Sequence, residues 1–350
     1  MRTRIERLRE SLDPNQSFFT DNLIHIRYLS GFTGSNAALL VNPDEAHLFT
    51  DSRYDIQSRH ETNGFFIHIV QNFFHDLKKS VNTESVVIET HHLHVGTYRT
   101  LEKELVGIKL IESTGIVEKL RIIKDSIELK HIDRACNIAT QALSATIAKV
   151  RAGMTEREIA LQIERSMIDF GADERAFDTI VASGENSAIP HHQPTFRELR
   201  NGDLLKIDFG AKVNGYHSDC TRTFVIGKPQ DWQREIFEAV VDAQRVGREA
   251  LRSGVTCSSI TDAVRKSLSD TSFAEKFTHG LGHGVGLEIH EDPYLSTQST
   301  GTLEAGTVVT VEPGVYLENL GGVRIEDTIE ITLDGYRNLT EFHYDLQQIG

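Results

Sequence analysis

The sequence predicts an α+β protein of two domains, and three observations lead to this expectation. The chain has 350 residues, and at roughly 150 residues per domain this length favours about two domains. Through residue 121, short apolar runs alternate with helical patterns, which is typical of a small α/β domain. From residue 122 onward, a pair of helices followed by strands occurs twice, which indicates a duplicated second domain. We therefore expect domains at 1–121 and 122–350, with the boundary in the charged segment 118–124.

Composition narrows the class of protein. Hydrophobic residues make up 39% of the chain and charged residues 25%, as in ordinary soluble globular proteins. A formal net charge of −14 argues against a general nucleic-acid binder and against binding to anionic membranes. The three cysteines are scattered, so neither a disulfide framework nor a cysteine-rich zinc site is expected. With no apolar signal segment and no run of about 20 apolar residues, the expected location is the cytoplasm.

The elements of the first domain follow from its periodicity. Four short apolar runs predict strands and three helical patterns predict helices. The strands are expected at 37–41, 47–50, 65–70 and 86–89, and the helices at 54–61, 73–80 and 98–106.

The second domain is expected to contain four helices. Asp125-x-x-Glu128 and Thr155-x-x-Glu158 are capping-box patterns that predict helix starts, and Gly254 is placed to end a third helix. The helices are expected at 126–150, 155–171, 231–252 and 259–269, with strand-rich regions at 177–226 and 303–343.

Three segments of the second domain recur in order. Arg151-Ala-Gly-Met-Thr matches Arg252-Ser-Gly-Val-Thr at an offset of 101, and the segment around Asp208 matches that around Glu312 at 104. Asp219-Cys-Thr matches Glu326-Asp-Thr at an offset of 107. Two halves related by a local two-fold axis would bring these four carboxylates together. An ionised carboxylate on a buried strand needs a partner or a metal ion, because burying its charge is unfavourable.

A hairpin sharpens this expectation. Asn214-Gly215 is a strong signal for a two-residue hairpin turn. Residues that pair across this hairpin have residue numbers that add up to 429. Asp208 should then face Thr221, with Asp219 as the diagonal neighbour on the same face. Diagonal neighbours lie about 7–8 Å apart, close enough for both side chains to reach one pair of ions.

Two groups of histidines differ in their surroundings. His91, His92 and His94 are expected to form a surface cluster that no acidic residues accompany. The segment from His279 to His290 has glycines at alternate positions, which let a backbone approach a site closely. It supplies His283 as the one imidazole beside the four carboxylates.

Mostly oxygen ligands with one imidazole suit Mn²⁺, with Co²⁺, Fe²⁺ and Zn²⁺ as alternatives. Two such ions about 3.5–4 Å apart can hold a bridging hydroxide and polarise a carbonyl oxygen, so we expect hydrolysis.

The motifs resemble one known family. The second domain is similar to the pita-bread metallopeptidases, in the aminopeptidase P and prolidase branch. The first domain resembles the creatinase-like N-terminal domain through Arg27-Tyr-Leu-Ser-Gly-Phe-Thr-Gly-Ser35 and Phe49-Thr-Asp-Ser-Arg-Tyr54. In the second domain the matching segments are Ser183 to His191, Leu204 to Gly210, His217 to Phe224, His279 to Pro293, Val311-Glu-Pro-Gly314 and Val323-Arg-Ile-Glu-Asp327.

The resemblance implies a smaller α/β creatinase/prolidase-like domain followed by a catalytic pita-bread domain with a duplicated ααβ arrangement. It also implies roles for nine residues. Two divalent metal ions would be bound by Asp208, Asp219, His283, Glu312 and Glu326, and no other cofactor is expected. His191, His279, His290 and Arg324 would line the substrate and stabilise the tetrahedral intermediate, and Glu312 is also the candidate proton acceptor.

The activity implied is that of an Xaa-Pro aminopeptidase, which removes an N-terminal residue preceding proline. The segment Phe32-Thr-Gly-Ser35 favours it over the alternative, an Xaa-Pro dipeptidase (prolidase). A pita-bread binding module without activity is a third alternative, disfavoured by the intact ligand set. The expected partners are proline-containing peptides and a second copy of the chain in a homodimer.

Overall fold

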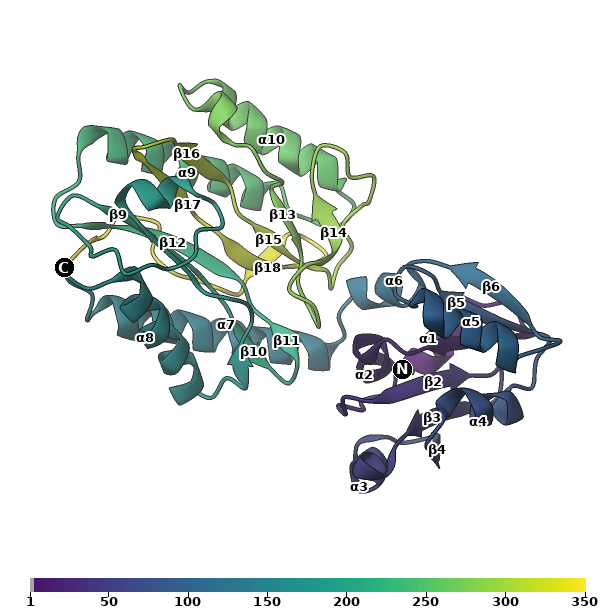
Figure 1. Ribbon diagram of the computed structural model, residues 1–350. Coiled ribbons are helices and arrows are strands. Elements are labelled where there is room, and N and C mark those ends of the chain that lie inside the picture. The colour runs from purple at the N-terminus through teal and green to yellow at the C-terminus, as the bar shows by residue number, and fades with distance from the viewer. Residues whose placement is uncertain (1–2) are drawn as a thin grey trace. The chain divides into compact units, whose positions relative to one another are not determined.

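The computed structural model describes residues 3–350 and contains two compact units (Figure 1). The N-terminal unit extends to Arg121 and the C-terminal unit covers Ile122–Gly350.

The N-terminal unit is built on one mixed six-stranded sheet in the order β4-β3-β2-β1-β5-β6. The pairs β1–β2 and β2–β3 are antiparallel, whereas β3–β4, β1–β5 and β5–β6 are parallel. Phe19 and Phe49 on the sheet pack in one apolar cluster with Leu77 and Leu101 from two helices. The strands are β1 (Gln16–Thr20), β2 (Ala37–Val41), β3 (Ala46–Thr50), β4 (Phe66–Ile69), β5 (Ser85–Glu89) and β6 (Lys109–Ser113).

Six α-helices and one 3₁₀ turn accompany this sheet. The helices expected near 54–61, 73–80 and 98–106 are present with ends shifted by up to three residues. Three further helices and two strands, β1 and β6, were not expected. The elements are α1 (Arg4–Glu10), α2 (Leu23–Ser30), η1 (Ser52–Tyr54), α3 (Asp55–Glu61), α4 (Phe73–Ser80), α5 (Val95–Glu104) and α6 (Ile116–Ile122).

The C-terminal unit contains four long helices, in two consecutive pairs. Asp125 caps the first helix by accepting from the backbone N–H groups of Ile127 and Glu128, so this predicted capping box is confirmed. The predicted box of Thr155 and Glu158 is also formed. Among residues 3–350 no helix combines the length and apolar character needed to cross a bilayer. The helices are α7 (Ser126–Ile147), α8 (Glu156–Asp169), α9 (Asp231–Glu249) and α10 (Cys257–Ser269).

Four sheets are formed by the strands of the C-terminal unit. The two largest have the orders β20-β12-β9-β8 and β14-β13-β15-β18-β19, and the smaller ones are β11-β10-β7 and β16-β17. Figure 1 shows the strands between α7 and α8 on one side and α9 and α10 on the other. The strand bounds are β7 (Glu174–Arg175), β8 (Ile180–Ser183), β9 (Leu204–Phe209), β10 (Ala211–Val213), β11 (Tyr216–His217), β12 (Cys220–Ile226), β13 (Gly282–Gly284), β14 (Glu291–Leu295), β15 (Val308–Val311), β16 (Gly314–Leu317), β17 (Gly321–Arg324), β18 (Asp327–Ile331), β19 (Tyr336–Asn338) and β20 (Gln348–Ile349).

The two halves of the C-terminal unit repeat the same contacts, so the predicted duplication is confirmed. The antiparallel pair β9–β12 of the first half corresponds to the antiparallel pair β15–β18 of the second. The backbone N–H of Gly153 donates to the carbonyl of Leu199 at 2.9 Å, and Gly254 donates in the same way to Leu303 at 2.9 Å. These residues are related by the offsets of 101 and 104 read from the sequence.

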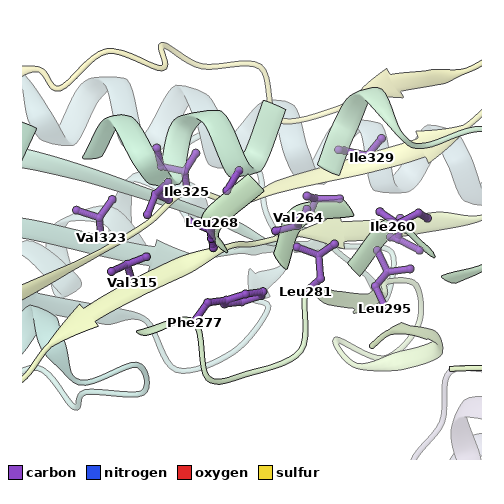
Figure 2. Close-up of a cluster of buried hydrophobic side chains, with 14 of the residues drawn as sticks. Ile260, Val264, Leu268, Phe277, Leu281, Leu295, Val315, Val323, Ile325 and Ile329 are labelled. Carbon is purple, nitrogen blue, oxygen red and sulfur yellow. The ribbon is translucent and has the colours of Figure 1, made fainter. Parts of the chain in front are cut away.

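Each half buries its own apolar core. In the first half, α7 and α8 pack against β8, β9 and β12 through residues such as Ile138, Ile163 and Ile207. In the second half, Ile260 and Val264 of α10 pack near Leu281, Leu295 and Ile329 (Figure 2). The strands between these cores therefore lie on a rigid support, which fixes the side chains at their ends.

Candidate metal centre

Asp208 and Asp219 are positioned by the hairpin that the sequence predicted. Asn214 and Gly215 have φ of 47° and 78°, as a type I′ turn requires, and Asp208 pairs with Thr221 in the expected register. Asp219 lies just before β12. Its backbone is held by Thr328, whose hydroxyl accepts from the Asp219 N–H at 3.1 Å and donates to the Asp219 carbonyl at 2.7 Å.

His283 is placed by close backbone contacts at the glycines on either side of it. A Cβ atom on Gly282 would lie 2.0 Å from the carbonyl oxygen of Thr310, and one on Gly284 would lie 2.3 Å from that of Asp292. Neither contact is sterically possible, so only glycine fits here. The close approach is to the backbone of neighbouring strands, and it brings β13 between β14 and β15, which leads into Glu312.

A hydrogen-bonded bridge joins the two halves at the site. The backbone N–H of Glu326 donates to the carbonyl of Thr221 at 3.1 Å. The hydroxyl of Thr221 donates to Oε2 of Glu326 at 2.7 Å. The imidazole Nε2 of His283 lies 3.6 Å from Oδ2 of Asp219 and 3.6 Å from Oε1 of Glu312. Ligand atoms of Asp219, His283 and Glu326 all lie within 4.8 Å of one another.

Arg324 is the buried cation that contacts this group of acids. Its Nη2 donates to Oδ2 of Asp208, its Nε donates to the Thr221 hydroxyl at 3.1 Å, and its Nη1 donates to the Tyr316 hydroxyl at 2.9 Å. The other carboxylate oxygen of Asp208, Oδ1, is buried and has no hydrogen-bond partner within residues 3–350. One guanidinium therefore leaves the negative charge of four carboxylates largely unbalanced.

The protonation of the site reflects this imbalance. Burial, reinforced by the charges of neighbouring carboxylates, raises the pKa values of Asp219 and Glu326 well above their ordinary range. Burial also raises the pKa of Glu312 to about 8. The pKa of His283 is lowered to about 4 by burial, so its imidazole is neutral at pH 7. Carboxylates that lack counter-charge beside a neutral imidazole suit divalent cations, so the residues present fit a metal centre.

One cavity of about 260 Å³ contains most of the predicted site. Eight of the nine predicted residues line it, and the exception is His279. The Nε2 of His279 instead contacts the hydroxyl of Tyr316 at 3.1 Å, the same hydroxyl that accepts from Arg324. Four lining residues were not predicted. The full lining is Phe177, Asp178, Ile180, His191, Asp208, Asp219, His283, Ile289, His290, Glu312, Arg324 and Glu326.

The loop that carries His191 is held by a buried acid, Glu156, which the sequence analysis did not single out. Its Oε1 accepts hydrogen bonds from Ser183 and Asn186, and its Oε2 accepts from Thr195 and lies 2.9 Å from Nε2 of His192. The side chain is fully buried. Glu156 looked like an ordinary first-turn residue in the sequence, because its partners lie about 30 residues further along the chain.

Glu156→Gln is expected to destabilise the protein and to flatten its acid sensitivity. Burial acts to raise the pKa of Glu156, but hydrogen bonds outweigh it and lower the pKa from 4.5 to about 2. Because the folded-state value lies below the ordinary one, the stabilisation is full above pH 4.5 and is lost as the pH falls toward 2. The shift corresponds to about 3 kcal/mol. Urea unfolding midpoints between pH 3 and 7 would measure it.

Glu158→Gln is the matched control, since Glu158 lies on the same helical turn but is exposed. It should lose less stability than Glu156→Gln and change the pH dependence less, because the capping bonds to Thr155 that lower the pKa of Glu158 are made at an exposed carboxylate. An unchanged pH dependence in Glu156→Gln would contradict the role given to the buried carboxylate.

The chain has two compact units and an acidic cavity in the second, and sequence comparisons identify its family. Residues 130–333 match Metallopeptidase family M24, and residues 4–123 match the Creatinase/Prolidase N-terminal domain. The chain belongs to metallopeptidase family M24, and its C-terminal unit is the pita-bread domain of that family. The resemblance noted from the motifs is thereby confirmed.

Several relatives are similar over nearly the whole chain. The Xaa-Pro dipeptidase of Pyrococcus furiosus is 37% identical, covering 99% of this chain and 100% of the relative. The structure of the Xaa-Pro dipeptidase from Bacillus anthracis has a TM-score of 0.96 and 34% identity, covering 99% of each chain. That of the X-Pro aminopeptidase from Thermotoga maritima has a TM-score of 0.92 and 35% identity, covering 97% of this chain and 99% of the other.

Proposed function

We propose that this metallopeptidase is an Xaa-Pro dipeptidase that hydrolyses the bond before a C-terminal proline. The observation that carries the proposal is the group of four carboxylates and one neutral imidazole on a single cavity, in a chain similar end to end to proteins named Xaa-Pro dipeptidase. The sequence analysis favoured the aminopeptidase and kept the dipeptidase as its alternative. The relatives fit that alternative better.

We propose that Asp208, Asp219, His283, Glu312 and Glu326 hold two divalent cations, with Mn²⁺ as the best match to an oxygen-rich set. When bound, such cations act as Lewis acids and lower the pKa of water. The Nδ1 of His283 contacts the carbonyl of Gly284 at 3.0 Å, which places its proton there and leaves the Nε2 lone pair directed at Asp219 and Glu312.

The remaining residues bind and orient the peptide. Glu312 is the group placed to accept the proton of the attacking water and to pass it to the departing proline nitrogen. His191 and His290 are exposed residues that line the cavity, where an N–H of either can donate to the oxyanion. Proline has a fixed φ and no N–H, so it needs a shaped pocket rather than strand pairing. The apolar side chains of Phe177, Ile180 and Ile289 provide surface for its ring.

The metal-loaded protein is expected to cleave Gly-Pro with a kcat/KM at least about 10-fold above that for Gly-Pro-Gly, a difference of about 1.4 kcal/mol in transition-state binding. A dipeptidase recognises the free carboxylate of the proline, which a third residue removes. Gly-Gly serves as the control without proline and should not be cleaved. Liberated proline or glycine, measured by amino-acid analysis, reports each reaction.

A preference for the tripeptide would instead establish the second candidate, an Xaa-Pro aminopeptidase. Similarity to the Thermotoga maritima X-Pro aminopeptidase favours that candidate. Cleavage of neither peptide by the metal-loaded protein would refute both.

We further propose that the protein acts as a homodimer in the cytoplasm. Its three cysteines are free and buried, which suits a reducing compartment. Ile189 and Phe196, on either side of His191, are 49% and 76% exposed and offer an apolar surface for a second copy. Light scattering should give twice the 39.3 kDa mass of the chain. A monomer would refute the dimer.

A further inference from the structure

Four titratable side chains from separate segments meet inside the N-terminal unit. His25 lies on α2, Glu89 ends β5, His91 follows in the next turn and Glu118 lies on α6. The expectation that acidic residues would be absent around His91 and His92 was wrong. Glu118 contacts His91, and Asp21 lies 3.9 Å from His92. None of these residues has a part in the proposed peptidase reaction.

We propose that His25, His91 and Glu118 bind one Zn²⁺, with Glu89 orienting His25. Both imidazoles direct Nε2 at the same oxygen, Oε1 of Glu118. The His25 nitrogen lies 3.6 Å from it, and the His91 nitrogen is in direct contact. Two ligands at about 2.0–2.1 Å from one tetrahedral Zn²⁺ lie about 3.3 Å apart. The His25–Glu118 spacing is therefore close to that of a zinc site, whereas His91 and Glu118, now in direct contact, would move apart to take the ion.

Glu89 supports His25 from the other side of the ring. The Nδ1 of His25 lies 3.0 Å from Oε2 of Glu89, to which it hydrogen-bonds, and 2.8 Å from Oε1. A carboxylate on the second nitrogen fixes the ring and makes Nε2 a better ligand, as is usual for histidines that bind metals.

Burial and charge favour a cation at this place. His25 and Glu89 are only 1% and 3% exposed. Both oxygens of Glu89 lie within 3.0 Å of His25 Nδ1, and among the described residues Oε2 of Glu118 is a buried oxygen without a hydrogen-bond partner. Glu89 is buried and Glu118 is 21% exposed, and two carboxylates so close together favour positive charge between them. Two imidazoles and a carboxylate are ligands that Zn²⁺ accepts, with solvent at the fourth position reached past the 37% exposed His91.

The ion would join three elements that are distant in the sequence. Helix α6 is seven residues long, with Val117 and Arg121 buried, and its Leu120 carbonyl accepts hydrogen bonds from Arg7 and Tyr28. Linking Glu118 to α2 and to the turn after β5 would hold α6 on the unit. The site is thus structural rather than catalytic, and it does not depend on the proposed peptidase activity.

Zinc content of the full-length protein tests the proposal. Bound metal ions are removed with EDTA, and the protein is then dialysed against micromolar Zn²⁺. The number of zinc ions per chain is measured by mass spectrometry. His91→Ala and the isosteric Glu118→Gln should each hold one zinc fewer than wild type. His60→Ala is the matched control, an exposed histidine of the same unit outside the cluster, and should equal wild type. Equal zinc in all four proteins would overturn the proposal.

Because the ligands of the candidate metal centre are also ones that Zn²⁺ accepts, the ion must be located as well as counted. Crystals of the zinc-loaded protein, measured at the zinc absorption edge, should show an anomalous peak about 2.0–2.1 Å from Nε2 of both His25 and His91. Glu326→Gln should keep this peak even where it loses zinc from the cavity. Peaks confined to the cavity would overturn the proposal and leave the peptidase assignment intact.

Discussion

Glu326→Gln is expected to lower kcat/KM for Gly-Pro at least about 10³-fold, because a lost metal ion removes several kcal/mol of transition-state stabilisation. The same change should make the metal-free protein more stable. In the metal-free state Glu326 is buried beside other carboxylates, and its raised pKa reflects that unfavourable charge. For a unit of this size, each kcal/mol gained raises the melting temperature by about 2–4 °C.

Metal content, turnover and melting of the EDTA-treated protein together test this prediction. Glu330→Gln is the matched control, because Glu330 lies on β18, which begins directly after Glu326, but pairs with Arg337. It should keep metal and activity. Wild-type turnover in Glu326→Gln would show that Glu326 is not a metal ligand. A lower melting temperature of its metal-free form would contradict the repulsion among the acids.

His290→Ala is expected to lower kcat by about 10²–10³-fold while the metal content stays at the wild-type value. His290 is exposed, lines the cavity, and its ring lies 4.4 Å from that of His283, centroid to centroid. Burial lowers its pKa, so the ring is neutral at pH 7 and can donate one N–H to the developing oxyanion.

Steady-state kinetics with Gly-Pro at saturating metal separate this role from substrate binding. An interaction made only in the transition state lowers kcat and kcat/KM equally. His343→Ala, an exposed histidine of the same unit that does not line the cavity, should be unaffected. A raised KM with unchanged kcat would show that His290 only binds substrate, and loss of metal would show that it is a ligand.

The parts of the site that the sequence could predict depend on local or repeated patterns. The Asn214-Gly215 turn set the register of Asp208 without any tertiary information. The repeat then related Asp208 and Asp219 to Glu312 and Glu326. The contact of His279 with Tyr316 could not be predicted, because spacing within a glycine-rich run does not say which way a side chain faces.

The unpredicted parts depend on contacts between distant segments. The role of Glu156 comes from Ser183, Asn186 and Thr195, and nothing in its own helix indicates them. In the N-terminal unit, α2 and α6 are short helices whose stability comes from packing more than from their own sequences. They were overlooked for that reason. The preference for dipeptides or tripeptides could not be predicted from the sequence either, since both activities use the same metal ligands.

The bridge between Thr221 and Glu326 has a consequence for how such a centre could have arisen. Since each half supplies only two of the acids, an ancestral half-chain could have assembled all four only by pairing with another copy of itself. Joining the copies in one polypeptide freed each to diverge. His217 now occupies the position that corresponds to Arg324 in the second half. The chain therefore keeps the backbone arrangement of a symmetric pair, but the two halves carry different side chains around the site.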